Sequence, residues 1–225
     1  MQRSLVGSEM CIRDRYIFWQ TQMNKGTHPT NYMIETERLI LRHWREEDAD
    51  ALFRHASDPE VGPVAGWAPH GSADYSREVI RTVFASPEIF AIVLKATGEP
   101  IGCCGLVMAD GEPEAATHID EAEIGYWVAK TYWGKGMMPE AVNALLDRAF
   151  NHLNLKTVYG AVYHGNTRSQ RVLEKCGFAY HHTAPPAVSP LGDIRTEHHF
   201  CITRSQWKSM KINAGAARRG DGGGR

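Results

Sequence analysis

The sequence predicts a single mixed α/β (α+β) domain. Strand-like and helix-like segments follow one another in the order strand, two helices, three strands, helix, strand, helix, two strands. A helical pattern at 137–153 lies between two β-rich segments, which is typical of a crossover that joins two parallel strands. A chain of 225 residues with 43% hydrophobic content is long enough to bury one substantial core.

In the first half of the chain, turn residues and charge mark the element boundaries. Acidic side chains at 46–48 suit the first turn of a helix, and Thr97-Gly98-Glu99 is a hairpin-type turn. The elements expected here are a strand at 34–42, a helix at 46–58, a loop broken by Gly and Pro at 61–71, a second helix at 73–85, and strands at 89–95 and 100–109.

In the second half, one segment has strong helical periodicity. Its apolar residues recur at i, i+3, i+4, i+7, i+8 and i+11 from Val142 to Leu153. The elements expected here are a polar loop at 110–117, a strand at 118–129, the helix that ends near 153, a strand at 157–163, a helix at 166–175, and strands at 177–182 and 194–203.

Composition excludes several classes of protein. The formal net charge of -1 gives no reason to expect nucleic acid or membrane partners, and no apolar run reaches the ~20 residues of a membrane helix. Five cysteines without metal-type spacing favour a reducing, cytoplasmic location. We interpret 1–32 as an artefactual or disordered leader, 33–210 as the folded domain and 211–225 as a disordered tail.

The most informative segment is the glycine turn at 133–138, Trp-Gly-Lys-Gly-Met-Met, directly before the long helix. Its amides at Gly134, Gly136, Met137 and Met138 can converge on an anion at the helix N-terminus. An ordinary turn that binds nothing is the alternative. An ATP-binding P-loop is disfavoured because the Gly-Lys-Ser/Thr ending is missing, and a dinucleotide fingerprint lacks its third glycine.

Other segments accompany this turn in a fixed order. ETERLILR spans 35–42, AEIGYWV spans 122–128, PEA follows the turn at 139–141, and GNTRSQRVLEKCGF spans 165–178. Together they resemble the GNAT superfamily of acetyl-CoA-dependent N-acetyltransferases. Within it, the chain resembles the branch that includes bacterial ribosomal-protein N-terminal (Rim-type) acetyltransferases. The resemblance covers residues 33–210.

The resemblance implies a GNAT-type fold, a mostly antiparallel twisted sheet with a central splayed parallel strand pair and flanking helices. Acetyl-CoA is then the cosubstrate, bound between the strands at 118–129 and 157–163. The glycine-turn amides would hold its pyrophosphate, and main-chain groups around Trp127 and Val128 its pantetheine arm. Asn166 would also bond that arm, while Lys135 and Arg168 would reach CoA phosphates.

Two positions depart from the family pattern. Leu173 stands where relatives often carry a tyrosine that reprotonates the leaving thiolate, and leucine cannot donate a proton. Ser169 occupies the place where this branch carries a serine near the CoA sulfur, so we assign it the acid role. Its alternative is a serine that bonds only the helix backbone. Thr131 replaces the Gln or Arg of many relatives, which puts a phosphate contact there in doubt.

The transfer requires a neutral amine. With a pKa of about 8, an α-amine is about one-tenth neutral at pH 7, whereas a lysine with a pKa of about 10.4 is almost entirely charged. Glu123, on the strand that would line the thioester, is therefore expected to act as general base, directly or through a water. The alternative is a strand glutamate that faces solvent or an arginine. We expect direct transfer without an acyl-enzyme.

The acceptor is expected to be a peptide N-terminal α-amine or a small amine, with Trp67, His70 and Tyr75 as candidate lining residues. The enzyme is expected to be a monomer or a homodimer. Two other functions stay open, a non-catalytic acyl-CoA sensor and a nucleotide-phosphate binder. No metal is expected, because the adjacent histidines at 181–182 and 198–199 face opposite ways along their strands.

Overall fold

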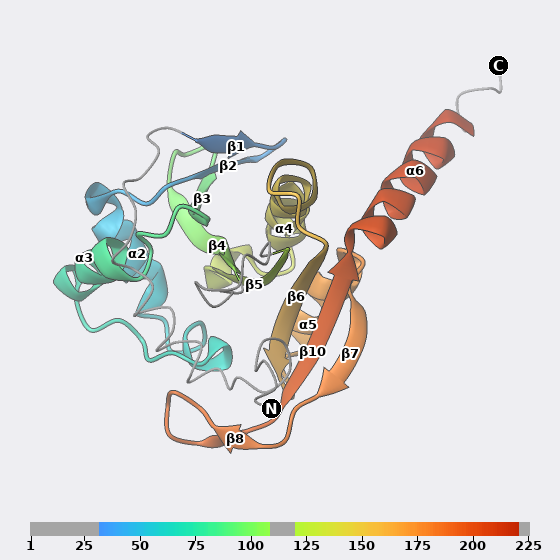
Figure 1. Ribbon diagram of the computed structural model, residues 1–225. Coiled ribbons are helices and arrows are strands. Elements are labelled where there is room, and N and C mark those ends of the chain that lie inside the picture. Colours follow the sequence, from blue (N-terminus) through green and yellow to red (C-terminus); the bar gives the residue numbers. More distant parts are fainter. Residues whose placement is uncertain (1–31, 109–119, 221–225) are drawn as a thin grey trace, which may run out of the picture.

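Eight strands form one sheet in the order β1-β2-β3-β4-β5-β6-β10-β7 in the computed structural model, which describes residues 32–108 and 120–220 (Figure 1). The strands are β1 Met33–Glu35, β2 Leu39–Arg42, β3 Ile89–Leu94, β4 Pro100–Met108, β5 Glu121–Val128, β6 Thr157–Tyr163, β7 Ala179–Thr183, β10 Glu197–Thr203, and a separate pair, β8 Ala187–Val188 and β9 Ile194–Arg195. The helices are α2 Ala49–Ala56, α3 Ala73–Thr82, α4 Met137–Asp147, α5 Thr167–Lys175 and α6 Arg204–Gly220.

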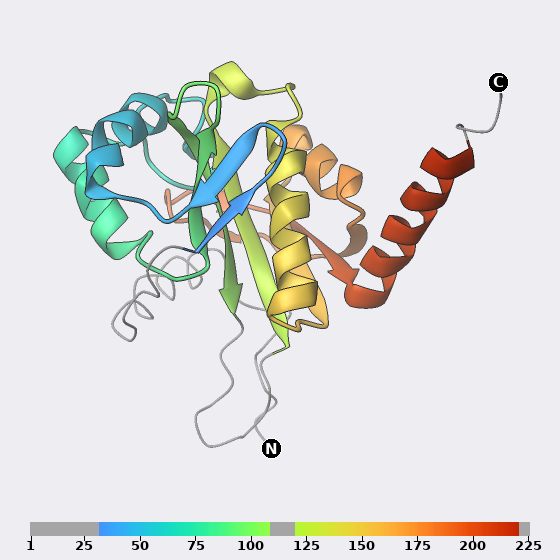
Figure 2. The same cartoon turned by 90° about the horizontal axis from the view of Figure 1, so that it is seen from above.

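Neighbouring strands of the large sheet run antiparallel except for β5 and β6, which are parallel and connected through α4. Helices cover both faces, with α2 and α3 on one and α4 on the other (Figures 1 and 2). The fold class expected from the sequence, including the central parallel pair, is therefore confirmed.

β5 and β6 separate part-way along their length. In the described chain they pair from Glu121 opposite Thr157 to Glu123 opposite Tyr159 and no further. β5 nevertheless stays paired with β4 as far as Val128, and β6 with β10 as far as Tyr163. The two strands thus open into a V beyond Glu123, which we call the fork.

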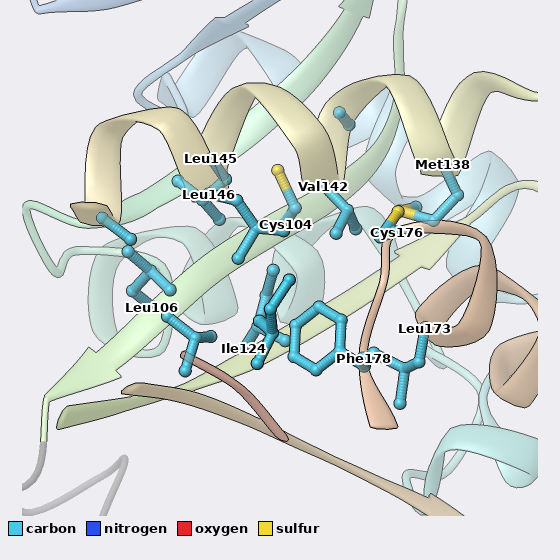
Figure 3. Packing of buried hydrophobic residues seen from close by; sticks show 14 of the residues in the cluster. Cys104, Leu106, Ile124, Met138, Val142, Leu145, Leu146, Leu173, Cys176 and Phe178 are labelled. Carbon is cyan, nitrogen blue, oxygen red and sulfur yellow. The ribbon is translucent and has the colours of Figure 1, made fainter. Parts of the chain in front are cut away.

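The larger core cluster lies between α4 and the sheet. Val142, Leu145 and Leu146 on α4 point toward Leu106 and Ile124 of the strands (Figure 3), and all five are at most 3% exposed. The apolar residues that recur with helical periodicity in the sequence form this buried face of α4. A π-helical turn, Arg148–His152, continues the helix and buries Phe150, so the long helix was predicted at the right place.

A smaller cluster lies on the opposite face, between α2, α3 and the sheet. Leu52 of α2 and Ile80 of α3 pack there against Ile89 and Ala91 of β3 and Cys103 of β4. A 3₁₀ turn of three acidic residues, Glu46–Asp48, precedes α2, as its composition predicts. The division into two faces matters for the site, because successive side chains of β5 belong to different clusters.

The segment expected as one strand at 34–42 is a hairpin instead. β1 and β2 pair with each other, and the main-chain N–H of Thr36 donates to the carbonyl of Leu39 over 2.9 Å. The Thr36 hydroxyl also accepts from the N–H of Leu39 over 3.0 Å. The alternation of apolar residues does not reveal a turn that is held by a side chain, because Thr is compatible with both a strand and a turn.

The C-terminal segment also differs from expectation. The expected strand at 194–203 is divided into β9 and β10, and α6 continues to Gly220, whereas we expect no regular structure after 210 from composition. α6 extends away from the body (Figures 1 and 2) and is anchored near its start by buried Trp207. Ala and Arg are strong helix formers, so a composition that cannot build a core can still continue a helix. The loop expected at 110–117, and residues 1–31 of the leader expected at 1–32, lie outside the described residues.

Candidate active site

The two faces of β5 carry different chemistry. Ile124 and Val128 belong to the cluster under α4, with Tyr126 packed against it. Trp127 packs on the α2–α3 cluster, and the alternation of a strand puts Glu123 and Gly125 on the same face as Trp127. A catalytic group on one face of β5 therefore approaches the fork from the opposite side to a group carried by α4 or α5.

The ladder between β4 and β5 determines which main-chain groups of β5 face the fork. The N–H of Ala129 donates to Ile101 over 2.8 Å, and the register places Cys103 opposite Trp127. Since bonded pairs alternate in an antiparallel ladder, the main chain of Trp127 faces β4, whereas that of Val128 faces the fork. Trp127 thus offers its side chain, not its main chain, to the site.

Val128 is partly engaged already. Its carbonyl accepts a 2.9 Å bond from the indole N–H of Trp133. Its N–H points away from β4 by the same alternation. Ile124 and Tyr126 share this direction, so the main-chain groups that can pair with an extended ligand in the fork come from Ile124, Tyr126 and Val128.

The glycine turn has the geometry of an anion site. Gly134 and Gly136 have φ angles of 74° and 76°, a left-handed region that glycine enters without strain. Gly136 is the N-cap of α4, and no side-chain cap hydrogen bond is made there within the described chain. The first N–H groups of a helix lack internal acceptors, and this applies to Met137 and Met138, both of which line the cavity.

A charged cluster braces this turn from the N-terminal hairpin. Glu140 Oε1 accepts from the Thr36 hydroxyl over 2.6 Å and from the N–H of Arg38 over 2.8 Å. Glu140 Oε2 accepts from Arg38 Nε over 2.7 Å, and Arg38 Nη1 donates to the carbonyl of Lys135 over 3.0 Å. Residues about 100 positions apart in sequence therefore fix the conformation of the glycine turn.

The two cations expected to reach CoA phosphates, Arg168 and Lys135, differ in their position relative to the cavity. The guanidinium of Arg168 stacks on Trp133, 4.3 Å from the ring centroid, and Arg168 lines the cavity. Lys135 Nζ lies 5.4 Å from the ring centroid of Tyr132, and Lys135 is absent from the described residues that line the cavity. Arg168 is the better placed of the two to reach a phosphate.

Asn166 and Ser169 meet at the start of α5. Asn166 Oδ1 accepts from the N–H of Ser169 over 3.2 Å and so caps the helix, while Asn166 Nδ2 donates to the carbonyl of Val64 over 3.0 Å. The carbonyl oxygen and the NH2 group of the Asn166 side chain each retain one further hydrogen-bonding site. A bond from Asn166 to a pantetheine arm would therefore be additional to these contacts.

Ser169 is paired with a residue that sequence reasoning missed. Its hydroxyl donates to the phenol oxygen of Tyr126 over 3.0 Å, and the phenol donates to the Ser169 carbonyl over 3.0 Å. Burial raises the pKa of Tyr126, so the phenol stays protonated at neutral pH. Leu173, in the family's tyrosine position, is 1% exposed in the core. A phenol therefore reaches this region from β5 instead of α5.

One cavity of about 940 Å³ joins these groups. The glycine turn, the first turns of α5 and the fork strand β5 all contribute to its wall. Glu123 also lines it, at the last paired position before the fork opens. The volume lies within the range of about 300–1,000 Å³ that small-molecule sites occupy.

On the α2–α3 side the cavity is lined by rings. Trp67 packs edge-on against Trp127, with centroids 5.8 Å apart, and against His70 at 5.5 Å. His70 contacts Tyr75 at 4.9 Å and bonds Ser76 through Nδ1 over 2.8 Å. Burial lowers the pKa of His70 to about 4, so this imidazole is neutral at pH 7. The structure thus brings the three candidate acceptor residues together.

Residues 61–67, which we call the roof loop, close one side of this compartment. Arg195 Nη1 donates to the carbonyl of Pro63 over 2.6 Å, and Asn166 holds the carbonyl of Val64. A Cβ atom on Gly62 would lie 2.6 Å from the ring of Trp67, so glycine is needed for Trp67 to sit where it does. The roof loop is therefore tied to both α5 and β9.

Three other features relate to the sequence predictions: the cysteine in the cavity wall, the groups that could bind a metal, and the helices that could span a membrane. Cys103 lines the cavity, and burial raises the pKa of its thiol to about 12. No group of three or more His, Cys, Asp or Glu residues suited to a metal occurs within 32–108 and 120–220. No helix in those same ranges is long and apolar enough to span a membrane.

Comparison with known proteins identifies the class. A sequence profile of the acetyltransferase (GNAT) domain matches residues 38–179, which is more than half of the chain. The chain therefore belongs to the GNAT superfamily, and it is an acetyl-CoA-dependent acyltransferase that transfers acetyl groups to amines.

Among individual proteins, the chain is 37% identical over 150 residues to the uncharacterized N-acetyltransferase p20 of Bacillus licheniformis, which covers 64% of this chain and 81% of the relative. A GNAT-family acetyltransferase from Bacillus anthracis superposes with a TM-score of 0.69 at 22% identity, over 77% of this chain and 99% of that one. The ribosomal-protein-S5-alanine acetyltransferase from Vibrio fischeri gives 0.62 at 21%, over 79% and 99%. These two structural likenesses show the shared fold.

Proposed function

We propose that this enzyme transfers an acetyl group from acetyl-CoA directly to a neutral primary amine, with Glu123 as general base and Ser169 as general acid. The observation that carries the proposal is the fork. It opens at Glu123, the glycine turn follows the end of β5, and the hydroxyl pair of Ser169 and Tyr126 lies on the face opposite to Glu123.

In this proposal the cosubstrate lies along the fork. The free amides of the glycine turn hold the pyrophosphate, assisted by the positive end of the α4 dipole. Main-chain groups of Tyr126 and Val128 pair with the pantetheine arm, as a strand partner would. The acyl group is then near Glu123, which lines the same cavity.

The reaction needs two proton movements. The amine nitrogen attacks the thioester carbonyl and gives a proton to Glu123, directly or through a water. The C–S bond then breaks, the electron pair goes to sulfur, and the thiolate takes a proton from the hydroxyl of Ser169. The Ser169 hydroxyl, which donates to the phenol oxygen of Tyr126 in the structure, turns toward the sulfur for this step. Solvent then returns a proton to Ser169 and removes the proton held by Glu123.

Direct transfer is supported by the nucleophiles available. Cys103 is the cysteine that lines the cavity within the described chain, and its pKa of about 12 keeps it a thiol at neutral pH. Thiolates, not thiols, attack thioesters effectively. We therefore propose no acyl-enzyme, and we expect no burst of acetylated protein in single-turnover reactions.

The acceptor we propose is an α-amine of a peptide N-terminus or of a small molecule. An α-amine has a larger neutral fraction at pH 7 than a lysine side chain has, by a factor of about 200 on reference pKa values of about 8 and about 10.4. A single carboxylate base is then sufficient. The fold shared with a ribosomal-protein acetyltransferase supports the peptide arm of this proposal.

The test is thiol release from acetyl-CoA across α-amines and lysine side-chain amines, with CoA affinity measured separately by calorimetry. Glu123→Gln is expected to lower kcat by about 100-fold, the lower range for general bases, and to leave CoA affinity unchanged. Glu121→Gln is the matched control, because Glu121 is on the same strand face two residues earlier and does not line the cavity. Equal kcat for wild type and Glu123→Gln would contradict the base assignment. CoA binding without release on any amine would favour a non-catalytic acyl-CoA sensor.

A further inference from the structure

The acceptor side of the cavity differs in chemistry from the cosubstrate side. Its lining on the α2–α3 face is apolar or aromatic, and includes Leu52, Trp67, Tyr75, Val79, Phe84 and Trp127. The cations of the cavity wall are Arg168, Arg171 and Lys175, all three on α5 at the other side of the fork. Within the described chain, Glu123 is the one acidic side chain in the lining.

From this distribution we infer that the acceptor is a singly charged primary amine attached to a bulky apolar or aromatic group. The inference rests on the proposed transfer to amines and adds the substrate class. Rings and aliphatic side chains stabilise an apolar body by removing it from water. The ring faces also tolerate one ammonium before it loses its proton.

The described lining holds no carboxylate besides Glu123 that could pair with a second positive charge on the acceptor. Burying an uncompensated ammonium is costly, and the one carboxylate in the lining is needed for the reacting amine. His70 supplies no negative charge, and because its pKa is about 4 it adds no positive charge either. Polyamines and aminoglycosides are therefore expected to be poor acceptors.

The compartment is also pre-formed. Trp67 is fixed by its close approach to Gly62 and by ring contacts with Trp127 and His70. The roof loop that carries Trp67 is bonded to Asn166 and Arg195. A rigid aromatic wall of this kind selects by shape with little ordering cost on binding.

The experiment compares kcat/KM for glycinamide, leucinamide, phenylalaninamide and lysinamide, which share one α-amine and differ in side chain. We expect phenylalaninamide to exceed glycinamide by about 10- to 200-fold, the range that hydrophobic pockets achieve. Lysinamide, spermidine and an aminoglycoside should fall at or below glycinamide. A peptide that begins with Phe distinguishes the two sources: a higher kcat/KM for the peptide than for phenylalaninamide indicates a peptide acceptor, and a lower one indicates a small-molecule acceptor.

Variants connect the preference to the rings. Trp67→Ala should reduce the ratio of phenylalaninamide to glycinamide at least fivefold while CoA affinity stays unchanged. Tyr75→Ala offers a second variant, since Tyr75 is 47% exposed and its removal leaves the core intact. Ile212→Ala, on the remote helix α6 and 70% exposed, should leave the ratio as in wild type.

The outcomes separate the two proposals. Equal kcat/KM for all four amides, or efficient acetylation of spermidine, overturns the acceptor inference and leaves the transfer reaction in place. An unchanged preference in both Trp67→Ala and Tyr75→Ala also overturns it. CoA binding with no transfer to any amine overturns the proposed function and the inference together.

Discussion

The contact between Arg38 and Glu140 provides the sharpest test of how the glycine turn is held. Glu140→Ala removes the acceptor of the Thr36 hydroxyl, the Arg38 N–H and the Arg38 guanidinium. Hydrogen bonds to charged groups are worth about 1.5–3 kcal/mol each. The Arg38 side chain is 40% exposed and that of Glu140 is 16% exposed, so water replaces part of what is lost and the contributions do not add.

We therefore expect Glu140→Ala to lower the free energy of unfolding by about 2 kcal/mol, or the Tm by about 4–8 °C for a chain of this size. Arg38 also donates to the Lys135 carbonyl inside the glycine turn. Loosening the turn should weaken acetyl-CoA binding by about 3- to 10-fold, equivalent to about 0.7–1.4 kcal/mol.

Urea denaturation and calorimetry with CoA measure these quantities for Glu140→Ala, Arg38→Ala and the double variant. A coupling energy of about 1 kcal/mol is expected for two residues in direct contact. Lys95→Ala is a suitable control, because its exposed pair with Glu35 also joins the N-terminal hairpin without touching the glycine turn. Strict additivity of the two substitutions, with CoA affinity unchanged in both, would refute the bracing role of this pair.

The same pair has a defined pH dependence. Burial raises the pKa of Glu140, but the bonds from Thr36 and Arg38 together outweigh it, so the pKa is lowered overall. A lowered pKa in the folded state contributes stability above the unfolded-state value of about 4.3. That contribution is lost as the pH falls through the lowered value. Glu140→Gln should therefore show a smaller loss of stability than wild type below about pH 4.3.

Three further predictions follow from single positions. Gly136→Ala should lower the free energy of unfolding by about 1–2 kcal/mol because the φ of Gly136 is positive, and it should also weaken CoA binding. Gly98→Ala is the control: Gly98 has a similar φ of 71° at a remote turn, so this substitution should cost as much stability and leave CoA affinity unchanged. Asn166→Asp should preserve the helix cap but lose the donor to Val64, so acceptor KM should rise while Tm changes by less than about 4 °C, equivalent to about 1 kcal/mol. Cys103, with a pKa of about 12, should resist iodoacetamide at pH 8 in the folded protein and react after unfolding, as mass spectrometry can show.

The sequence predicted those parts of the structure that repeat locally. The buried stripe of α4 follows from apolar spacing, and the strand at 157–163 has the expected bounds. The left-handed turn at Gly134 and Gly136 also follows from local chemistry, because few other residues adopt those angles. Such features are encoded within a few residues of one another and require no knowledge of the fold.

What the sequence did not predict depends on distant partners. Arg38 and Glu140 are 102 positions apart, and no local pattern pairs them. The hydroxyl of Tyr126 on β5 reaches Ser169 on α5, 43 positions away in the sequence, and no local pattern pairs them either. The signal available in the sequence was that Tyr126 stands two residues before Val128, whose main chain is expected to bind the pantetheine arm. The placement of Trp127 main-chain groups likewise required the register with β4.

The two-faced arrangement of β5 has an evolutionary consequence. In the proposed reaction, the parts that recognise the acetyl donor lie with α4 and α5, whereas the parts that recognise the acceptor lie with α2, α3 and the roof loop. Substitutions in one layer need not disturb the other, because the strand between them separates their side chains. A lineage with this scaffold can exchange its acceptor by changing a handful of rings and keep its acetyl source untouched.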